Sequence, residues 1–139
     1  EDVRINMYDA GVYYQNNRFH IEAEYLYKMY GHNAFDDVHS VNSFVNYDLP
    51  LKKVFNKISF LARYDMMTDH SNGKADVETG VLKINDYARH RVTGGVTLSL
   101  SKAFIADLRL NFEKYFYKKS GIPKESECDK IVIEFMTRF

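Results

Sequence analysis

The sequence contains no tryptophan, one cysteine and two prolines among its 139 residues. The single cysteine, Cys128, excludes an internal disulfide framework and a zinc site built on paired cysteines. Lysine plus arginine and aspartate plus glutamate number 19 each, so the net charge does not indicate a nucleic-acid partner. No stretch approaches the roughly 18 consecutive apolar residues of a membrane-spanning helix. The sequence is therefore that of neither a disulfide-rich domain nor a helical membrane protein.

Aromatic residues and alternating polarity are abundant instead. Tyrosine occurs 11 times and phenylalanine 10 times, and apolar and polar residues alternate through most of the chain. Alternation with a period of two predicts β-strands that have one polar and one apolar face. We predict a single all-β, antiparallel domain over residues 1–139, with seven strands at residues 4–15, 19–30, 41–49, 57–67, 90–100, 104–117 and 130–139.

Two architectures produce this alternation. In a soluble antiparallel sandwich or lipocalin-like barrel, the apolar face packs a core and the polar face meets water. In a transmembrane β-barrel the apolar face meets lipid, and about 10 residues of tilted strand cross the hydrocarbon layer. The soluble form is the more common of the two, but three features of this sequence favour the membrane form.

The first feature is the order of the connections between predicted strands. The connections at 16–17, 50–56 and 101–103 are tight or moderate, whereas those at 31–40, 69–88 and 118–129 are longer. Outer-membrane barrels have short periplasmic turns and longer extracellular loops. The order therefore indicates a barrel whose short connections face the periplasm.

The second feature is the position of the aromatic residues on the apolar faces. They gather toward the two strand ends, where amphipathic rings favour lipid headgroups. The expected periplasmic group is Tyr14, Phe19, Tyr47, Phe104 and Phe139, and the opposite group is Tyr8, Tyr25, Tyr27, Tyr64, Phe112 and Phe116.

The third feature is the last predicted strand, which alternates outward to a final phenylalanine. It resembles the C-terminal strand of bacterial outer-membrane barrels. That resemblance implies that Phe135 and Phe139 belong to a signal read by the outer-membrane assembly machinery.

Three segments carry a more specific resemblance. LARYDMMTD at 61–69, HRVTGGVTLSLSKAFIADLRLNFEKYF at 90–116 and DKIVIEFMTRF at 129–139 resemble the C-terminal portion of the phosphate-selective porin O and P family. The resemblance implies a homotrimer of barrels of about 16 strands, which pass anions across the outer membrane of a Gram-negative bacterium. Because bacterial barrels normally have an even number of strands, we expect these seven to be part of a larger barrel.

The polar faces supply the residues expected to line a pore. They are Glu22, Glu24, Lys28, Arg63, Asp65, Arg91, Asp107, Arg109, Glu113 and Glu134. With Asp9, Asp48 and Arg138 added, the expected inward charges are five positive and eight negative. An anion filter needs rings of positive charge. We therefore predict a channel for passive diffusion of small polar or charged solutes, with anions such as phosphate among them, rather than a phosphate-specific pore.

The sequence shows no clear motif for metal binding or catalysis. The five histidines lack the spacing of a metal site, and the residues around 69–73 lack that of a calcium loop. No nucleophile elbow, phosphate loop or dinucleotide fingerprint is present. We predict no catalytic residues, no metal, no cofactor and no nucleic-acid partner; the expected partners are membrane lipid, small solutes or ions, and the assembly machinery. Two alternatives remain: a small or plugged barrel with a structural or loop-mediated role, and, more distantly, a soluble carrier.

The alternation also suggests a register for the strands at 90–100 and 104–117. A three-residue turn at 101–103 would pair Leu98 with Ala106 and keep apolar residues opposite one another. The same register places Arg91 opposite Glu113 and Gly95 opposite Arg109.

Overall fold

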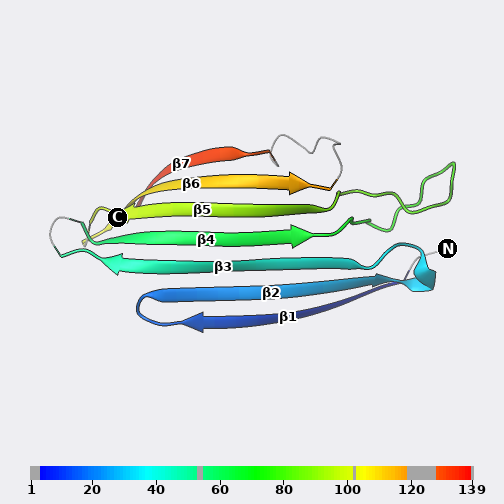
Figure 1. Ribbon diagram of the computed structural model, residues 1–139, viewed down its shortest axis with the longest axis horizontal. Coiled ribbons are helices and arrows are strands. Elements are labelled where there is room, and N and C mark those ends of the chain that lie inside the picture. The colour runs from blue at the N-terminus through cyan, green and yellow to red at the C-terminus, as the bar shows by residue number, and fades with distance from the viewer. Residues whose placement is uncertain (1–3, 53–54, 102, 119–127, 139) are drawn as a thin grey trace.

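A computed structural model describes residues 4–52, 55–101, 103–118 and 128–138. They form one seven-stranded antiparallel sheet, in which every strand pairs with its neighbours in the chain (Figure 1). A short 3-10 turn, η1 (Gly31–Asn33), follows the second strand. The all-β antiparallel prediction is confirmed. The strands are β1 (Ile5–Gln15), β2 (Phe19–Tyr30), β3 (Val38–Pro50), β4 (Lys57–Met67), β5 (Arg89–Ser99), β6 (Ile105–Tyr117) and β7 (Lys130–Arg138).

The largest difference in strand boundaries is at β3, which begins at Val38 rather than at Val41. Val38 and His39 reverse the polarity expected of the two faces, so the alternation misses them. They are nevertheless paired with Lys28 and Tyr27 of β2, and the ring of His39 stacks on that of Tyr27 at a centroid distance of 5.1 Å. Cross-strand ring contact therefore extends β3 beyond its apolar pattern.

The sheet is open, with β1 and β7 as its two edges. In the described part of the chain these two strands do not pair with each other, so the seven strands form no closed barrel among themselves. An edge strand leaves a row of backbone N–H and C=O groups without sheet partners. No helix in the described ranges is long and apolar enough to span a membrane.

The expected order of connections is confirmed. The connections at 16–18, 51–56 and 100–104 are short, and the strand ends that they join lie together at one end of the sheet (Figure 1). The opposite end carries η1 and the long connection at 68–88, and the connection at 118–129 also joins strands there. Residues 119–127 of that last connection lie outside the described residues.

The two faces of the sheet differ in chemistry. One, called here the apolar face, carries Leu110 of β6 with Ile133 and Phe135 of β7, which are 51 %, 71 % and 64 % exposed. Among the described residues the only buried hydrophobic side chains are Tyr30, Val38, Leu82 and Ala106. Most apolar side chains of the strands are therefore exposed on the sheet rather than packed in a core.

The small core that exists lies where β2 and β3 meet the 68–88 connection. Tyr30, Val38 and Leu82 form its buried centre, and Phe35 and Met67 pack against it. Within the connection, Ala75 pairs with Leu82 and His70 with Asp86, so its two halves run antiparallel. This connection thus folds against the sheet as an ordered hairpin-like segment.

The register expected for β5 and β6 is wrong by two residues. Leu98 pairs with Leu108 rather than with Ala106, and Arg91 lies opposite Tyr115 rather than Glu113. The connection spans residues 100–104 instead of a three-residue turn. A shift of two preserves the face of every side chain, because the side-chain period of a strand is two. The alternation therefore cannot distinguish the two registers.

Gly95 accounts for part of the observed register. It lies opposite Asn111, not Arg109, and a Cβ at Gly95 would come within 2.1 Å of the Asn111 Oδ1 atom. The neighbouring Gly94 has open space at the same position, with no atom within 4 Å. Gly95 therefore leaves room for the Asn111 amide.

Aromatic rings of the apolar face gather toward both strand ends. At the end with short connections, the rings of Phe19 and Tyr47 lie 4.8 Å apart, and Tyr47 pairs with Phe60. At the other end tyrosines meet histidines. The hydroxyls of Tyr25 and Tyr64 lie 2.7 Å from the Nδ1 atoms of His39 and His90 respectively. Phe139, expected in the first group, lies outside the described residues.

Candidate functional site

The residues predicted to line a pore share one face of the sheet, called here the polar face. Cross-strand partners lie on the same face, and one row of partners runs from Glu24 through Asn42 and Asp65 to Arg91. The register and the alternation put the other predicted pore-lining residues on the same face. They are Glu22, Lys28, Arg63, Asp107, Arg109, Glu113 and Glu134.

Three cations of the polar face are not among the expected pore-lining residues: Lys57, Arg89 and Lys130. Each is the first residue of its strand, β4, β5 or β7. The residues that follow in each strand fix the face of its first residue by parity, so the alternation already indicates these positions, although Arg89 lies just outside the strand predicted at 90–100. With these three added to the five expected, the polar-face cations equal the eight expected anions.

Asp65 of β4 lies between two arginines at the centre of this face. Arg63 Nε donates to the two Asp65 carboxylate oxygens at 3.0 and 2.9 Å. From β5, Arg91 Nε and Nη2 lie 2.8 and 2.7 Å from Asp65 Oδ2. One carboxylate thus holds two guanidinium groups, so this part of the face keeps a net positive charge.

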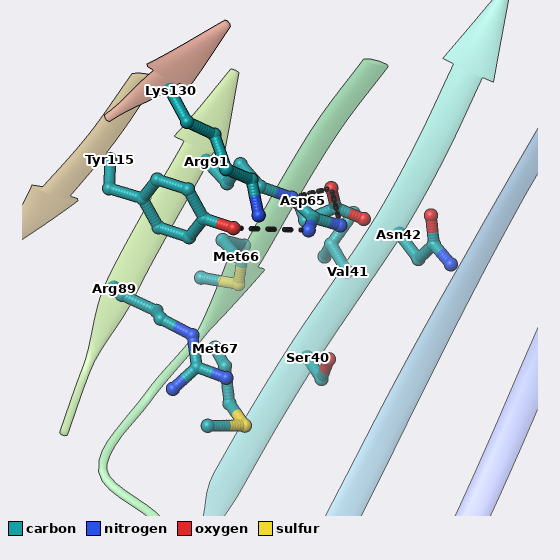
Figure 2. A pocket seen from close by; sticks show the side chains of 10 residues that line it. All are labelled: Ser40, Val41, Asn42, Asp65, Met66, Met67, Arg89, Arg91, Tyr115 and Lys130. Carbon is teal, nitrogen blue, oxygen red and sulfur yellow. Dashed lines mark hydrogen bonds and ion pairs between the residues drawn. The ribbon is translucent and has the colours of Figure 1, made fainter. Parts of the chain in front are cut away.

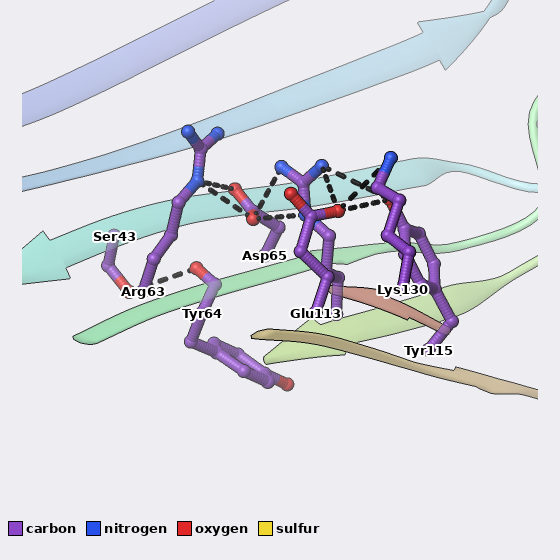
Figure 3. A network of polar contacts seen from close by, with 8 residues as sticks. Ser43, Arg63, Tyr64, Asp65, Glu113, Tyr115 and Lys130 are labelled. Carbon is purple, nitrogen blue, oxygen red and sulfur yellow. Dashed lines mark hydrogen bonds and ion pairs between the residues drawn. The ribbon is translucent and has the colours of Figure 1, made fainter. Parts of the chain in front are cut away.

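The network continues across β6 to β7. Arg91 Nη1 donates to the Tyr115 hydroxyl at 3.3 Å, and that hydroxyl donates to Glu113 Oε2 at 3.1 Å. Lys130 Nζ lies 3.4 Å from the same Glu113 oxygen. Figure 3 shows these polar side chains on one side of the sheet and the Tyr64 ring on the other. Four strands therefore contribute to one continuous network, which holds each of its charged groups in place.

A hollow of about 430 Å³ lies beside this network (Figure 2). Its basic side is formed by Arg89, Arg91 and Lys130, and its opposite wall by Ser40 and Asn42 of β3. The Asn42 Oδ1 atom is buried and has no hydrogen-bond partner among the described residues. The hollow is open to the polar face and presents donors from cations together with polar groups, an arrangement suited to contacts with hydrated polar solutes.

Charge is divided unevenly across the polar face. The part on β1–β3 has four acidic residues and one basic residue, whereas the part on β4–β7 has seven basic and four acidic residues. The acidic set is Asp9, Glu22, Glu24 and Asp48 with Lys28 among them; the basic set is Lys57, Arg63, Arg89, Arg91, Arg109, Lys130 and Arg138. An electric field therefore runs over the polar face perpendicular to the strands, from the basic part on β4–β7 to the acidic part on β1–β3.

Two further ion pairs lie nearer the short connections. The Asp48 carboxylate accepts hydrogen bonds from Lys57 Nζ and, at 2.6 Å, from Ser59 Oγ. Arg109 Nη1 donates to Glu134 Oε2 at 3.0 Å. Arg109, expected opposite Gly95, instead lies opposite Thr97 on β5 and Glu134 on β7.

The residues described supply charged and hydrogen-bonding groups rather than a metal centre. Within the described ranges no three His, Cys, Asp or Glu side chains are grouped so as to hold a metal ion. Comparison with protein-family models, curated proteins and solved structures finds no match for this chain. The function proposed for this chain is therefore based on the sheet and its two faces.

Proposed function

We propose that this chain forms part of the wall of an outer-membrane β-barrel channel of the porin type, through which small polar or charged solutes diffuse passively. The observation that carries the proposal is the pairing of an exposed apolar face with a charged polar face on one sheet that has almost no core. In this role the chain is not an enzyme, and it resides in the outer membrane of a Gram-negative bacterium.

The exposed apolar face supports a lipid environment. Transfer of apolar surface from water is favourable by roughly 25 cal/mol per Å², and soluble monomers rarely expose contiguous apolar patches beyond a few hundred Å². Here the apolar face continues across neighbouring strands, from Val96 to Leu110 and Ile133, all of them exposed. Lipid would cover this face without a second protein layer.

The strand lengths suit a bilayer. β1, β4 and β5 have 11 residues each, β2 has 12, and β3 and β6 have 13. A tilted strand of about 9 to 11 residues crosses the hydrocarbon layer. The tyrosine–histidine contacts at one end and the Phe19–Tyr47 contact at the other would then lie near the two headgroup layers.

The open edges support a larger assembly. Backbone groups inside a bilayer need hydrogen-bond partners, and strands reach this condition by closing into a barrel. Further strands must therefore pair with β1 and β7, either from the same polypeptide or from other copies. We propose a barrel of about 16 strands, assembled as a trimer, in line with the resemblance described above. Phe135, exposed on the apolar face of β7, and Phe139 would form the assembly signal.

The charges of the polar face favour a general channel. Its equal numbers of cations and anions do not form the ring of positive charge that an anion filter uses. Solutes would meet a basic side around Arg91 and an acidic side around Glu24. Anions such as phosphate would pass among other solutes.

A second candidate is a plugged barrel with a structural or loop-mediated role. It is favoured by one observation, the docking of the 68–88 connection against Lys28 and Tyr30 of the polar face. A connection folded over this face would narrow a lumen on that side.

Single-channel recording in planar lipid bilayers tests the channel, using the protein in its native assembly. We expect stepwise currents, with Asp65→Asn shifting the reversal potential toward anion preference and Arg109→Gln toward cation preference. Lys83→Gln, which removes a charge within the 68–88 connection, should leave ion preference unchanged. Absence of current would contradict the channel and favour the plugged barrel.

A further inference from the structure

Lys28 of β2 is a buried cation that has no carboxylate partner among the residues the structure describes. Lys28 is only 6 % exposed, and no Asp or Glu in the described part of the chain forms an ion pair with it. Its ammonium instead donates to the Ser71 carbonyl oxygen at 2.8 Å and to His70 Nε2 at 3.2 Å, and it lies 4.5 Å from the centre of the Tyr30 ring. The buried charge is therefore solvated by neutral groups, two of which belong to the 68–88 connection.

Ser71 is the point at which this connection is held to the sheet. The residue is completely buried, with an exposed fraction of 0 %. Its carbonyl accepts from both Lys28 and the Tyr30 hydroxyl, and its backbone N–H donates to the same Tyr30 oxygen at 3.1 Å. The two side chains of β2 thereby satisfy both backbone groups of one residue.

The contact between Lys28 and His70 requires a neutral imidazole. An ammonium group only donates hydrogen bonds, so Nε2 must be the unprotonated ring nitrogen and Nδ1 carries the proton. Nδ1 is buried without a hydrogen-bond partner in the described part of the chain, and it lies 4.0 Å from Asp86 Oδ2. A second proton on the ring would point directly at the Lys28 ammonium.

We propose that the 68–88 connection is an acid-released latch: it stays docked on the polar face while His70 is neutral, and protonation of His70 detaches it. Protonation turns the Nε2 acceptor into a donor and places a second positive charge 3.2 Å from the buried Lys28 ammonium, on a half-buried imidazole. Detachment lets both cations reach water, which removes the conflict.

The surroundings of His70 favour its neutral form, which is the form that keeps the 68–88 connection docked. Burial and then the Lys28 ammonium lower the pKa of His70 from its ordinary value of 6.5, with a smaller effect of Arg89 in the same direction. Asp86 acts in the opposite direction, and Tyr30 on β2 contributes only a neutral hydroxyl near Ser71. Because the pKa is lower in the docked form, docking weakens as the pH falls below about 6.5 and continues to weaken down to the lowered value.

This inference does not depend on the channel, because it concerns contacts within the chain. Where the sheet does form a channel wall, the latch would let acid move the 68–88 connection away from the polar face. A change in conductance with pH is then a consequence, while the docking itself is measured without any current.

Amide hydrogen exchange on the whole chain tests the latch, with the Ser71 amide as the reporter. After correction for the intrinsic effect of pH, we expect its protection to fall by about tenfold between about pH 7.5 and about pH 5, while the β4 and β5 amides keep theirs. His70→Gln keeps a neutral acceptor for Lys28 and should lose this pH dependence. His20→Gln, the same change at another polar-face histidine, should retain it.

Two outcomes would overturn the proposal: protection of Ser71 that does not change with pH in the unaltered chain, or an undiminished pH dependence in His70→Gln. If His70→Gln lost the protection of the β4 and β5 amides, it would be misfolded. The unaltered chain then decides, because the ring signals of His70 must titrate at the pH at which Ser71 loses protection. A titration midpoint elsewhere would also rule out the latch.

Discussion

Arg91 of β5 lies opposite Tyr115 of β6, and its guanidinium donates to the tyrosine hydroxyl at 3.3 Å. Glu113, two residues earlier on β6, lies diagonally from Arg91, with a nitrogen–oxygen distance of 4.0 Å. The direct ion pair of Arg91 is with Asp65 on β4 instead. Arg91 therefore connects both neighbouring strands, and Tyr115 relays its contact to Glu113.

Substitution on β6 distinguishes the two faces. Leu110 and Asn111 are neighbours in sequence, but their side chains lie on the apolar and polar faces. In a lipid bilayer, Leu110→Arg should destabilise the fold by about 2 to 4 kcal/mol, because the charge would face hydrocarbon, whereas Asn111→Arg should cost less than about 1 kcal/mol. Reversible unfolding in phospholipid vesicles measures both. Equal costs would show that the apolar face does not meet lipid.

Substitution of the two adjacent glycines of β5 tests the β5–β6 register. Gly95→Val should destabilise the sheet by about 1 to 3 kcal/mol, because the new side chain would collide with the Asn111 amide. Gly94→Val, which enters open space, should change stability by less than about 0.5 kcal/mol. Denaturant titration gives both values. Adding Asn111→Ala to Gly95→Val should restore stability; no coupling between these two sites would refute the pairing of Gly95 with Asn111.

Acidification should weaken the contact between Asp129 and β6. Asp129 accepts from Lys114 Nζ and, at 2.8 Å, from the Tyr115 backbone N–H. The hydrogen bond from Lys114, and then that from Tyr115, lower the pKa of Asp129 from its ordinary value of 3.8. The Asp129 carboxylate therefore stabilises this contact fully above pH 3.8, and the stabilisation is lost as the pH falls through the lowered pKa of Asp129.

Exchange of the Tyr115 amide with solvent, corrected for its intrinsic rate, should accelerate in that acidic range. Asp129→Asn should abolish this step, because the amide oxygen still accepts but does not titrate. Asp76→Asn is the control: the pKa of Asp76 is also lowered, first by Lys83, but it lies in the 68–88 connection. A step that survives in Asp129→Asn would assign it to another group.

The strands and their faces follow from the sequence alone. A period of two is a local property, since each residue such as Leu110 or Asn111 takes its face from its immediate neighbours. Exceptions occur where a contact outweighs polarity, as at His39, whose ring stacks on Tyr27. Lys57 follows the rule as well, since it shares the polar face with Ser59 and Arg63 of the same strand.

The β5–β6 register and the docking of the 68–88 connection are determined by the tertiary structure. The alternation permits any even shift, and the close fit of Asn111 against Gly95 is compatible with the observed one. Likewise, nothing in the sequence indicates that Ser71 meets Lys28, because these residues are 43 positions apart and the contact depends on how the 68–88 connection folds back. Local patterns determine which way a side chain points; which distant group it meets depends on the packing of the whole sheet.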